Sequence, residues 1–137
     1  MGRILAIDYG TKRTGIAVTD PLQIIATSLA TVDTFKIFDF LNNYFELENV
    51  ELVVIGLPKT LKGEFSENEK HILLFIEKFK KKFPSYNIIR FDERFTSSMA
   101  SQTLIDAGYK KKQRQNKKLL DSVAATIILQ GYLLSVQ

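Results

Sequence analysis

Short apolar runs alternate with polar and turn-forming residues in the first part of the chain. Runs at Arg3–Asp8, Thr14–Thr19 and Ile24–Val32 have the length and composition of β-strands, and Asp20-Pro21 marks the turn between the last two. The segments between these runs are short, so each strand is expected to pair with its neighbour in the chain. The pattern therefore predicts an antiparallel meander of three strands.

A helical period follows the meander. Apolar residues recur three or four positions apart from Asp33 or Thr34 onward and predict an amphipathic helix that ends near Asn49: Phe35, Phe38, Leu41 and Phe45. The next apolar run, Leu52–Ile55, is continuous. A continuous apolar run of this length predicts a strand that is covered on both faces.

The second half of the chain predicts one more strand and three helices. Ser66 and Glu69 have the spacing of a capping box, and the helix after them is expected to bury four apolar residues: Ile72, Leu73, Ile76 and Phe79. Tyr86–Phe91 predicts the last strand. Two helices are predicted to finish the chain, one over residues 97–107 that is stopped by Gly108 and one over about 116–134.

Together these elements predict an α/β fold in one domain spanning residues 1–137: a five-stranded mixed sheet flanked by helices. The first strand and the two later strands are expected to be parallel neighbours, because a helical crossover precedes each of the later pair. The carboxyl ends of these strands then lie at one edge of the sheet, where open α/β folds build their sites.

Composition excludes several classes of protein. The 137 residues suit one globular domain and are too few for two lobes that close on a ligand. The absence of cysteine excludes a disulfide framework and thiolate metal sites. No signal peptide or long uncharged apolar run is recognisable, so we expect a soluble cytoplasmic protein without membrane association. A net charge of +4 and a pI near 9.3 fit a polyanionic partner.

Three acidic residues stand at comparable places in this architecture. Asp8 ends the first strand, Glu93 follows the last strand, and Asp121 lies in the final helix beside small residues that would allow close packing on the sheet edge. Converging carboxylates repel one another unless cations compensate them, and their hard oxygens suit Mg²⁺ or Mn²⁺. Two such ions about 4 Å apart can assist attack of water on a phosphodiester. The set predicts a two-metal nuclease site, whereas each acid taken singly also fits a turn or surface position.

Basic residues near these acids are candidates for binding a nucleic-acid backbone. They are Lys12 and Arg13 in the first turn, Arg94 beside Glu93, and a dense run with no intervening acid: Lys110, Lys111, Lys112, Arg114, Lys117 and Lys118. Binding through such residues would be strongly salt-dependent. The simpler interpretations are solvated turn residues, a residue that holds Glu93 in place, and a solubilising loop.

Three further features are assigned structural roles. Lys78–Lys82 is expected to be the solvated end of a helix, where cations favour the helix dipole. His71 has no partner histidine or cysteine in the pattern and is assigned no metal role. The phenylalanines at helical spacing are assigned to the core rather than to a surface that stacks on bases.

Four segments in order resemble the YqgF family: Ile7–Val18, Val54–Pro58, Asp92–Ser97, and Asp121–Ala125 with Ile128–Gln130. The likeness covers essentially the whole chain. It implies a ribonuclease H-like fold, with Asp8, Glu93 and Asp121 as the metal-binding catalytic acids. It also implies a cytoplasmic nuclease that processes the 5′ end of the 16S rRNA precursor in ribosome biogenesis.

Other functions stay open at this point. Members of the YqgF family are also described as Holliday junction resolvases, so branched DNA in recombination or repair is the alternative substrate. Paired cutting of a junction would favour a homodimer, and a strictly monomeric protein would weigh against it. For rRNA processing, a ribosomal particle is a candidate partner. A non-catalytic nucleic-acid-binding protein is the second alternative. The first strand, turn and strand also resemble the phosphate-binding hairpin of actin-like ATPases and sugar kinases, but the chain lacks the length for their second lobe.

Overall fold

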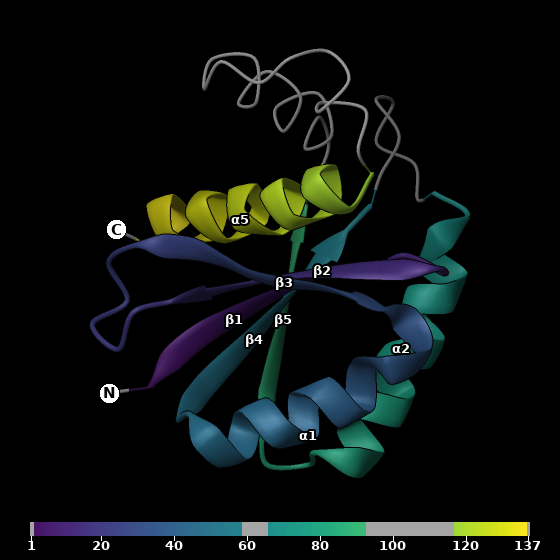
Figure 1. Cartoon of the computed structure of the whole chain (residues 1–137), viewed down its shortest axis with the longest axis horizontal. Helices are drawn as coiled ribbons and strands as arrows, with labels where there is room; N and C mark the ends of the chain where they lie inside the picture. The colour runs from purple at the N-terminus through teal and green to yellow at the C-terminus, as the bar shows by residue number, and fades with distance from the viewer. Residues whose placement is uncertain (1, 59–65, 93–116, 137) are drawn as a thin grey trace.

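A five-stranded mixed sheet lies between two layers of helices, with the strand order β3-β2-β1-β4-β5 (Figure 1). The computed structural model describes residues 2–58, 66–92 and 117–136, and within the last range it describes side chains from Val123 onward. The strands are β1 (Arg3–Asp8), β2 (Arg13–Thr19), β3 (Ala26–Asp33), β4 (Val50–Leu57) and β5 (Asn87–Asp92). The helices are the 3₁₀-helix η1 (Thr34–Lys36), α1 (Ile37–Leu47), α2 (Asn68–Lys82) and α5 (Lys117–Ser135).

The directions of the strands confirm the predicted topology. β1 pairs antiparallel with β2, and β2 pairs antiparallel with β3, so the first three strands form the expected meander. β4 pairs parallel with both β1 and β5. The carboxyl ends of β1, β4 and β5 therefore lie at one edge of the sheet, which we call the carboxyl edge.

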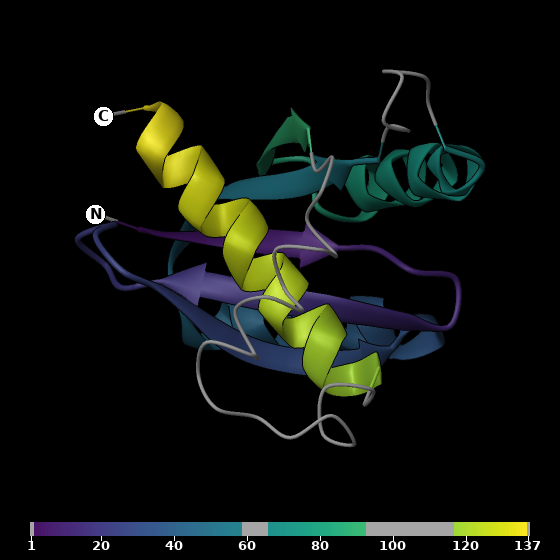
Figure 2. The same cartoon turned by 90° about the horizontal axis from the view of Figure 1, so that it is seen from above.

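Each face of the sheet has its own core. α1 and α2 cover one face, and α5 runs across the other (Figures 1 and 2). Along β1, Leu5 and Ile7 pack with α1 and α2, whereas Ile4 and Ala6 pack with α5. Because successive strand residues point to opposite faces, Asp8 takes the parity of Ile4 and Ala6 and belongs to the face that α5 covers.

Small residues bring α5 close to the sheet, as expected from the sequence. Ala124 and Ala125 are buried, and Ala125 packs with Ala6 and other residues of the α5-side core. Toward the end of the helix, a Cβ built on Gly131 would lie 2.8 Å from the ring of Phe91 in β5. That distance is too short for any side chain, so glycine at this position allows α5 to approach β5.

Three predictions about side chains in the first two helices are wrong. Leu73 is 53% exposed, because α2 buries the stripe Ile72, Phe75, Ile76 and Phe79, and Leu73 lies beside that stripe. Phe35 is 81% exposed and is not a core residue. The predicted capping box also does not form: Ser66 N donates to the carbonyl of Pro58, and the Glu69 carboxylate binds Arg90 instead.

The other helical predictions that fall within the described residues agree with the structure. Phe38, Leu41 and Phe45 pack in the core on the α1 and α2 side. The lysines of Lys78–Lys82 are exposed in the last turns of α2, as predicted for a solvated helix end. Within the described residues, no helix combines the length and the apolar character needed to cross a membrane. The helix predicted over residues 97–107 lies outside the described residues.

Candidate active site

The carboxyl edge places Asp8 at the meeting point of three strands. Asp8 is the last residue of β1 and pairs with Gly15 of β2, while Ile7 next to it pairs with Ile55 of β4. The end of β4 is in turn in register with the end of β5, through the pair Leu57 and Asp92. Asp8 is only partly buried. Its carboxylate therefore has access to solvent at a position that the sheet fixes.

The two other predicted acids are described less fully. Glu93 follows Asp92, the last residue of β5, and lies outside the described residues. The backbone of Asp121 belongs to α5, but its side chain lies outside the described part. Figures 1 and 2 both show that α5 begins at the end of the sheet toward which β1 and β4 point. The start of this helix and the carboxyl edge are thus on the same side of the molecule.

No complete metal site lies within the described side chains. Among residues 2–58, 66–92 and 123–136, no group of three His, Cys, Asp or Glu residues is placed to hold a metal ion. The predicted set contains only one acid, Asp8, whose side chain is described. The chemistry of the predicted set fits a divalent cation, because carboxylate oxygens are the ligands that Mg²⁺ and Mn²⁺ prefer.

The turn after Asp8 is held by side chains from both neighbouring helices. The Thr34 hydroxyl of η1 donates to the carbonyl of Gly10 at 2.6 Å and shares a 2.9 Å hydrogen bond with the buried hydroxyl of Thr14. The Asn68 side-chain amide, at the start of α2, donates to the carbonyl of Tyr9 at 2.8 Å. These hydrogen bonds fix the turn at both ends, so the residues around Asp8 form a rigid part of the carboxyl edge.

Thr34 and Asn68 are not among the residues predicted from the sequence. The sequence pattern predicts only a helix start at Thr34, and the turn it binds lies 24 residues earlier in the chain. Asn68 is 59 residues from Tyr9. Such distant pairs carry no periodic signal in a single sequence, because the fold alone brings them together.

Glycine is required inside this turn. A Cβ built on Gly10 would collide with the carbonyl oxygen of Arg13, so the two sides of the turn approach more closely than any side chain at this position permits. Lys12, at the tip, is exposed, and its carbonyl accepts a 2.9 Å hydrogen bond from Thr34 N. The tip therefore presents a cation to solvent beside the end of β1.

A second rigid element supports the ends of β4 and β5. The Arg90 guanidinium donates two hydrogen bonds to the Glu69 carboxylate, at 2.6 and 3.0 Å, and a third to the carbonyl of Gly56 at 3.0 Å. Both side chains are largely buried, at 22% exposed for Arg90 and 11% for Glu69. This ion pair joins α2 to β4 and β5, which end at the same edge of the sheet as β1. It was not predicted, because the spacing of Ser66 and Glu69 indicated a helix cap.

The other predicted basic residues are described only in part. Arg13 begins β2 and is partly buried. Lys117 and Lys118 form the first residues of α5, with their side chains outside the described part. The remaining predicted residues lie outside the described residues: Arg94, Lys110, Lys111, Lys112 and Arg114.

Comparison with solved structures supports the fold. The chain is similar to RuvC of T. thermophilus in complex with a Holliday junction substrate, with a TM-score of 0.55 over 99% of this chain and 96% of that one. The sequence identity is 14%, so the likeness concerns the fold. It agrees with the ribonuclease H-like fold that the sequence resemblance implied.

Comparison with sequences gives a much closer relationship. A protein of Flavobacterium psychrophilum is 58% identical over 97% of this chain and 97% of its own length, and one of Bacteroides fragilis is 55% identical over 97% and 96%. Both carry the name "Putative pre-16S rRNA nuclease". The model of the RuvX family, described as Holliday junction resolvase, matches residues 2–135. With nearly the whole chain matched, this protein belongs to the RuvX family, which is also called YqgF.

Proposed function

We propose that this protein is a divalent-metal-dependent nuclease that processes the 5′ end of the 16S rRNA precursor in the cytoplasm. The observation that carries the proposal is the position of Asp8. This carboxylate ends the central strand at the edge where three parallel strands finish, in a chain more than 50% identical to relatives named for rRNA processing.

The proposed ligands of the metal are Asp8, Glu93 and Asp121. Glu93 is two residues after Phe91 in the sequence, and Asp121 is one helical turn before Ala125. Both Phe91 and Ala125 pack in the core between the sheet and α5, which is the face that Asp8 takes by alternation. We therefore expect the two further carboxylates on the same face and at the same edge as Asp8.

The proposed chemistry is hydrolysis of a phosphodiester. Three carboxylates have the charge and the hard oxygens needed to hold Mg²⁺ or Mn²⁺. When bound, two such ions would lower the pKa of an attacking water and stabilise the leaving oxygen. The role of the protein is to hold the carboxylates rigidly, and the hydrogen bonds of the turn after Asp8 supply that rigidity on one side.

The proposed substrate contacts beyond the acids are basic. Lys12 is exposed at the turn next to Asp8, and Arg13 begins the following strand. We assign phosphate binding to these two residues and to the predicted basic set: Arg94, Lys110, Lys111, Lys112, Arg114, Lys117 and Lys118. Phosphate contacts fix the register of a nucleic acid on a protein and make binding dependent on salt.

Branched DNA is the second candidate substrate. The description of the matching family model favours it, whereas the names of the relatives favour the rRNA precursor. A junction resolvase cuts two strands at symmetrical positions, which would require a homodimer. Precursor trimming has no such requirement, and a ribosomal particle is the partner expected for it.

A direct comparison of two end-labelled substrates tests the proposal. One is a 5′-extended fragment of the 16S rRNA precursor, free and within a ribosomal particle, and the other is a four-way DNA junction. We expect cutting of the RNA with Mg²⁺ or Mn²⁺ and no cutting with a chelator. Symmetrical cutting of the junction instead would identify a resolvase. Binding without cutting of every substrate would overturn the nuclease proposal in favour of a non-catalytic binding role.

A further inference from the structure

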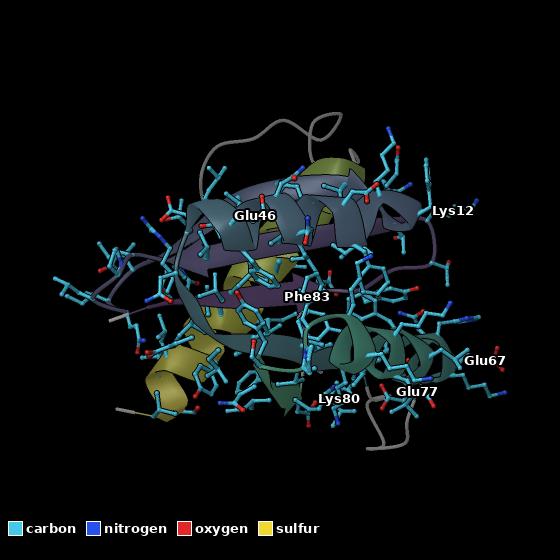
Figure 3. All side chains as sticks on the ribbon, turned by 90° about the horizontal axis from the view of Figure 1, so that it is seen from below. Lys12, Glu46, Glu67, Glu77, Lys80 and Phe83 are labelled. Atoms are coloured by element: carbon cyan, nitrogen blue, oxygen red, sulfur yellow. The ribbon has the colours of Figure 1, made fainter. Side chains whose placement is uncertain are left out.

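A cleft of about 440 Å³ lies between η1, α1 and α2, on the face of the sheet opposite α5. Figure 3 shows this side of the molecule, with α1 and α2 lying over the sheet and Lys12 labelled on the turn beside them. Tyr9 and Thr11 of that turn line one end of the cleft. The cleft therefore begins at Tyr9, the residue after Asp8, and lies on the face of the sheet opposite the one that Asp8 takes.

Aromatic rings form one side of this cleft. Tyr9 lies 4.9 Å from Phe75, and Phe38 stacks on Phe75 at 5.3 Å, between ring centroids. Phe35 lines the cleft from η1 and is 81% exposed, which is unusual for so large an apolar side chain. The Lys36 ammonium lies over the Phe35 ring, 5.5 Å from its centroid, and the rest of the ring is open to a planar partner.

The charge of the cleft suits a phosphate. Lys78 and His71, both exposed and on one side of α2, also line it, and none of its described lining residues is acidic. A second hollow of about 530 Å³ is also lined by Phe35, but its charged lining residues are two acids, Asp33 and Asp39, and one cation, Lys36, so its net charge is negative. A phosphodiester is therefore favoured in the first cleft, whose lining has a lysine and no acid, over the second hollow with its net negative charge.

The cleft is formed before any ligand binds. The hydrogen bonds of Thr34 with Gly10 and of Asn68 with the Tyr9 carbonyl attach the turn to η1 and α2, which are the two walls of the cleft. The same bonds hold the turn that follows Asp8. A strand in the cleft would therefore have a fixed position relative to the carboxyl edge.

We infer that this cleft binds an unpaired nucleotide of the substrate strand, with its base against Phe35 and a neighbouring phosphate near Lys78. The inference rests on the proposed nuclease function and adds to it that the substrate is single-stranded next to the cleavage site. Bases inside a duplex are covered by their neighbours, whereas an unpaired base can stack on an aromatic ring.

Binding without cleavage tests the inference. Fluorescence anisotropy with a short labelled single-stranded RNA, in the presence of a chelator, measures affinity for wild type, Phe35→Ala and Lys78→Gln. We expect Phe35→Ala to weaken binding by at least about fivefold, the loss of one stacked base. Lys78→Gln should weaken binding. It should also make the slope of log affinity against log salt concentration shallower, by the amount that corresponds to about one phosphate contact. An RNA duplex of the same sequence should bind equally to wild type and Phe35→Ala.

Two matched variants control for surface effects. Leu47 has the same 81% exposure as Phe35 and lies at the opposite end of α1, so Leu47→Ala removes an equally exposed apolar side chain away from the cleft. Lys80→Gln removes an exposed lysine from α2 that does not line the cleft. Both controls should bind the single strand as wild type does.

The outcomes separate this inference from the proposed function. Unchanged affinity in Phe35→Ala, an equal loss in Leu47→Ala, or no binding of single strands by wild type overturns the cleft assignment. If any of these results appears in a protein that cuts RNA in a metal-dependent way, the nuclease proposal stands and only the assignment of the cleft is wrong. A loss specific to Phe35→Ala in a protein that cuts neither substrate would keep the cleft and overturn the nuclease.

Discussion

Replacing Asp8 by asparagine should abolish metal-dependent cleavage while leaving the fold intact. Asparagine keeps the size of the side chain at the end of β1 but removes the negative charge that would hold a cation in the proposed site. We expect the cleavage rate to fall by on the order of 10³-fold or more, because a site whose groups act as a unit loses most of its rate with one of them. Single-turnover cleavage measures the effect, and circular dichroism checks the fold.

The same reasoning predicts how the acids combine. Glu93→Gln and Asp121→Asn should each cause a loss similar to that of Asp8→Asn, and the triple variant should be scarcely slower than any single one. Glu46→Gln is the matched control, since Glu46 is an exposed acid on α1 and outside the proposed site. Full activity in any of the three single variants would remove that residue from the site.

Removing the Arg90 side chain should have the largest effect on stability. Arg90→Ala removes both hydrogen bonds from Arg90 to the mostly buried Glu69 carboxylate. It also removes the hydrogen bond from Arg90 to the Gly56 carbonyl. Breaking a buried ion pair on one side costs about 3 kcal/mol or more in the free energy of unfolding. Urea denaturation measures this loss as a lower urea concentration at the unfolding midpoint, with an unchanged dependence of the free energy of unfolding on urea concentration.

A surface ion pair of the same chain provides the comparison. Arg3 and Glu48 lie 3.2 Å apart with side chains that are 25% and 42% exposed. Exposed pairs contribute about 1 kcal/mol or less, so Glu48→Gln should lower stability far less than Arg90→Ala. If the two variants lose equal stability, the Arg90 and Glu69 pair does not hold the ends of β4 and β5 as described.

The sheet could be predicted because its signals are local. The apolar run that ends at Asp8 and the run Leu52–Ile55 both became strands, and their length and continuity reflect burial on both faces. The short connections of the meander and the crossover at α2 then left few topologies open. The parallel arrangement of β1, β4 and β5 followed from these connections.

The errors arose where tertiary contacts compete with local patterns. Ser66 and Glu69 have the spacing of a cap, but Arg90 from a distant strand binds Glu69 more strongly than a backbone N–H would. Phe35 has the period of the core helix, yet it lies in η1, which precedes α1 and turns its ring outward. Neither the contact of Arg90 with Glu69 nor the outward position of the Phe35 ring can be recognised from the neighbouring residues in the sequence.

In the candidate site, too, the features with a local sequence signal could be predicted, and those that depend on contacts distant in the sequence could not. The position of Asp8 at a strand end was a local signal, and the structure places it at the carboxyl edge as predicted. The side chains that hold the turn after Asp8 come from Thr34 and Asn68, which only the fold brings to it. The placement of Glu93 and of the Asp121 carboxylate remains a prediction.

The most direct test of the proposed metal site is a crystal of the protein soaked in Mn²⁺, with the metal located by anomalous scattering. We predict Mn²⁺ bound by the carboxylates of Asp8, Glu93 and Asp121, and no ion at that place in crystals of Asp8→Asn. A well-ordered site with these three carboxylates apart and no Mn²⁺ beside Asp8 would contradict the proposed function.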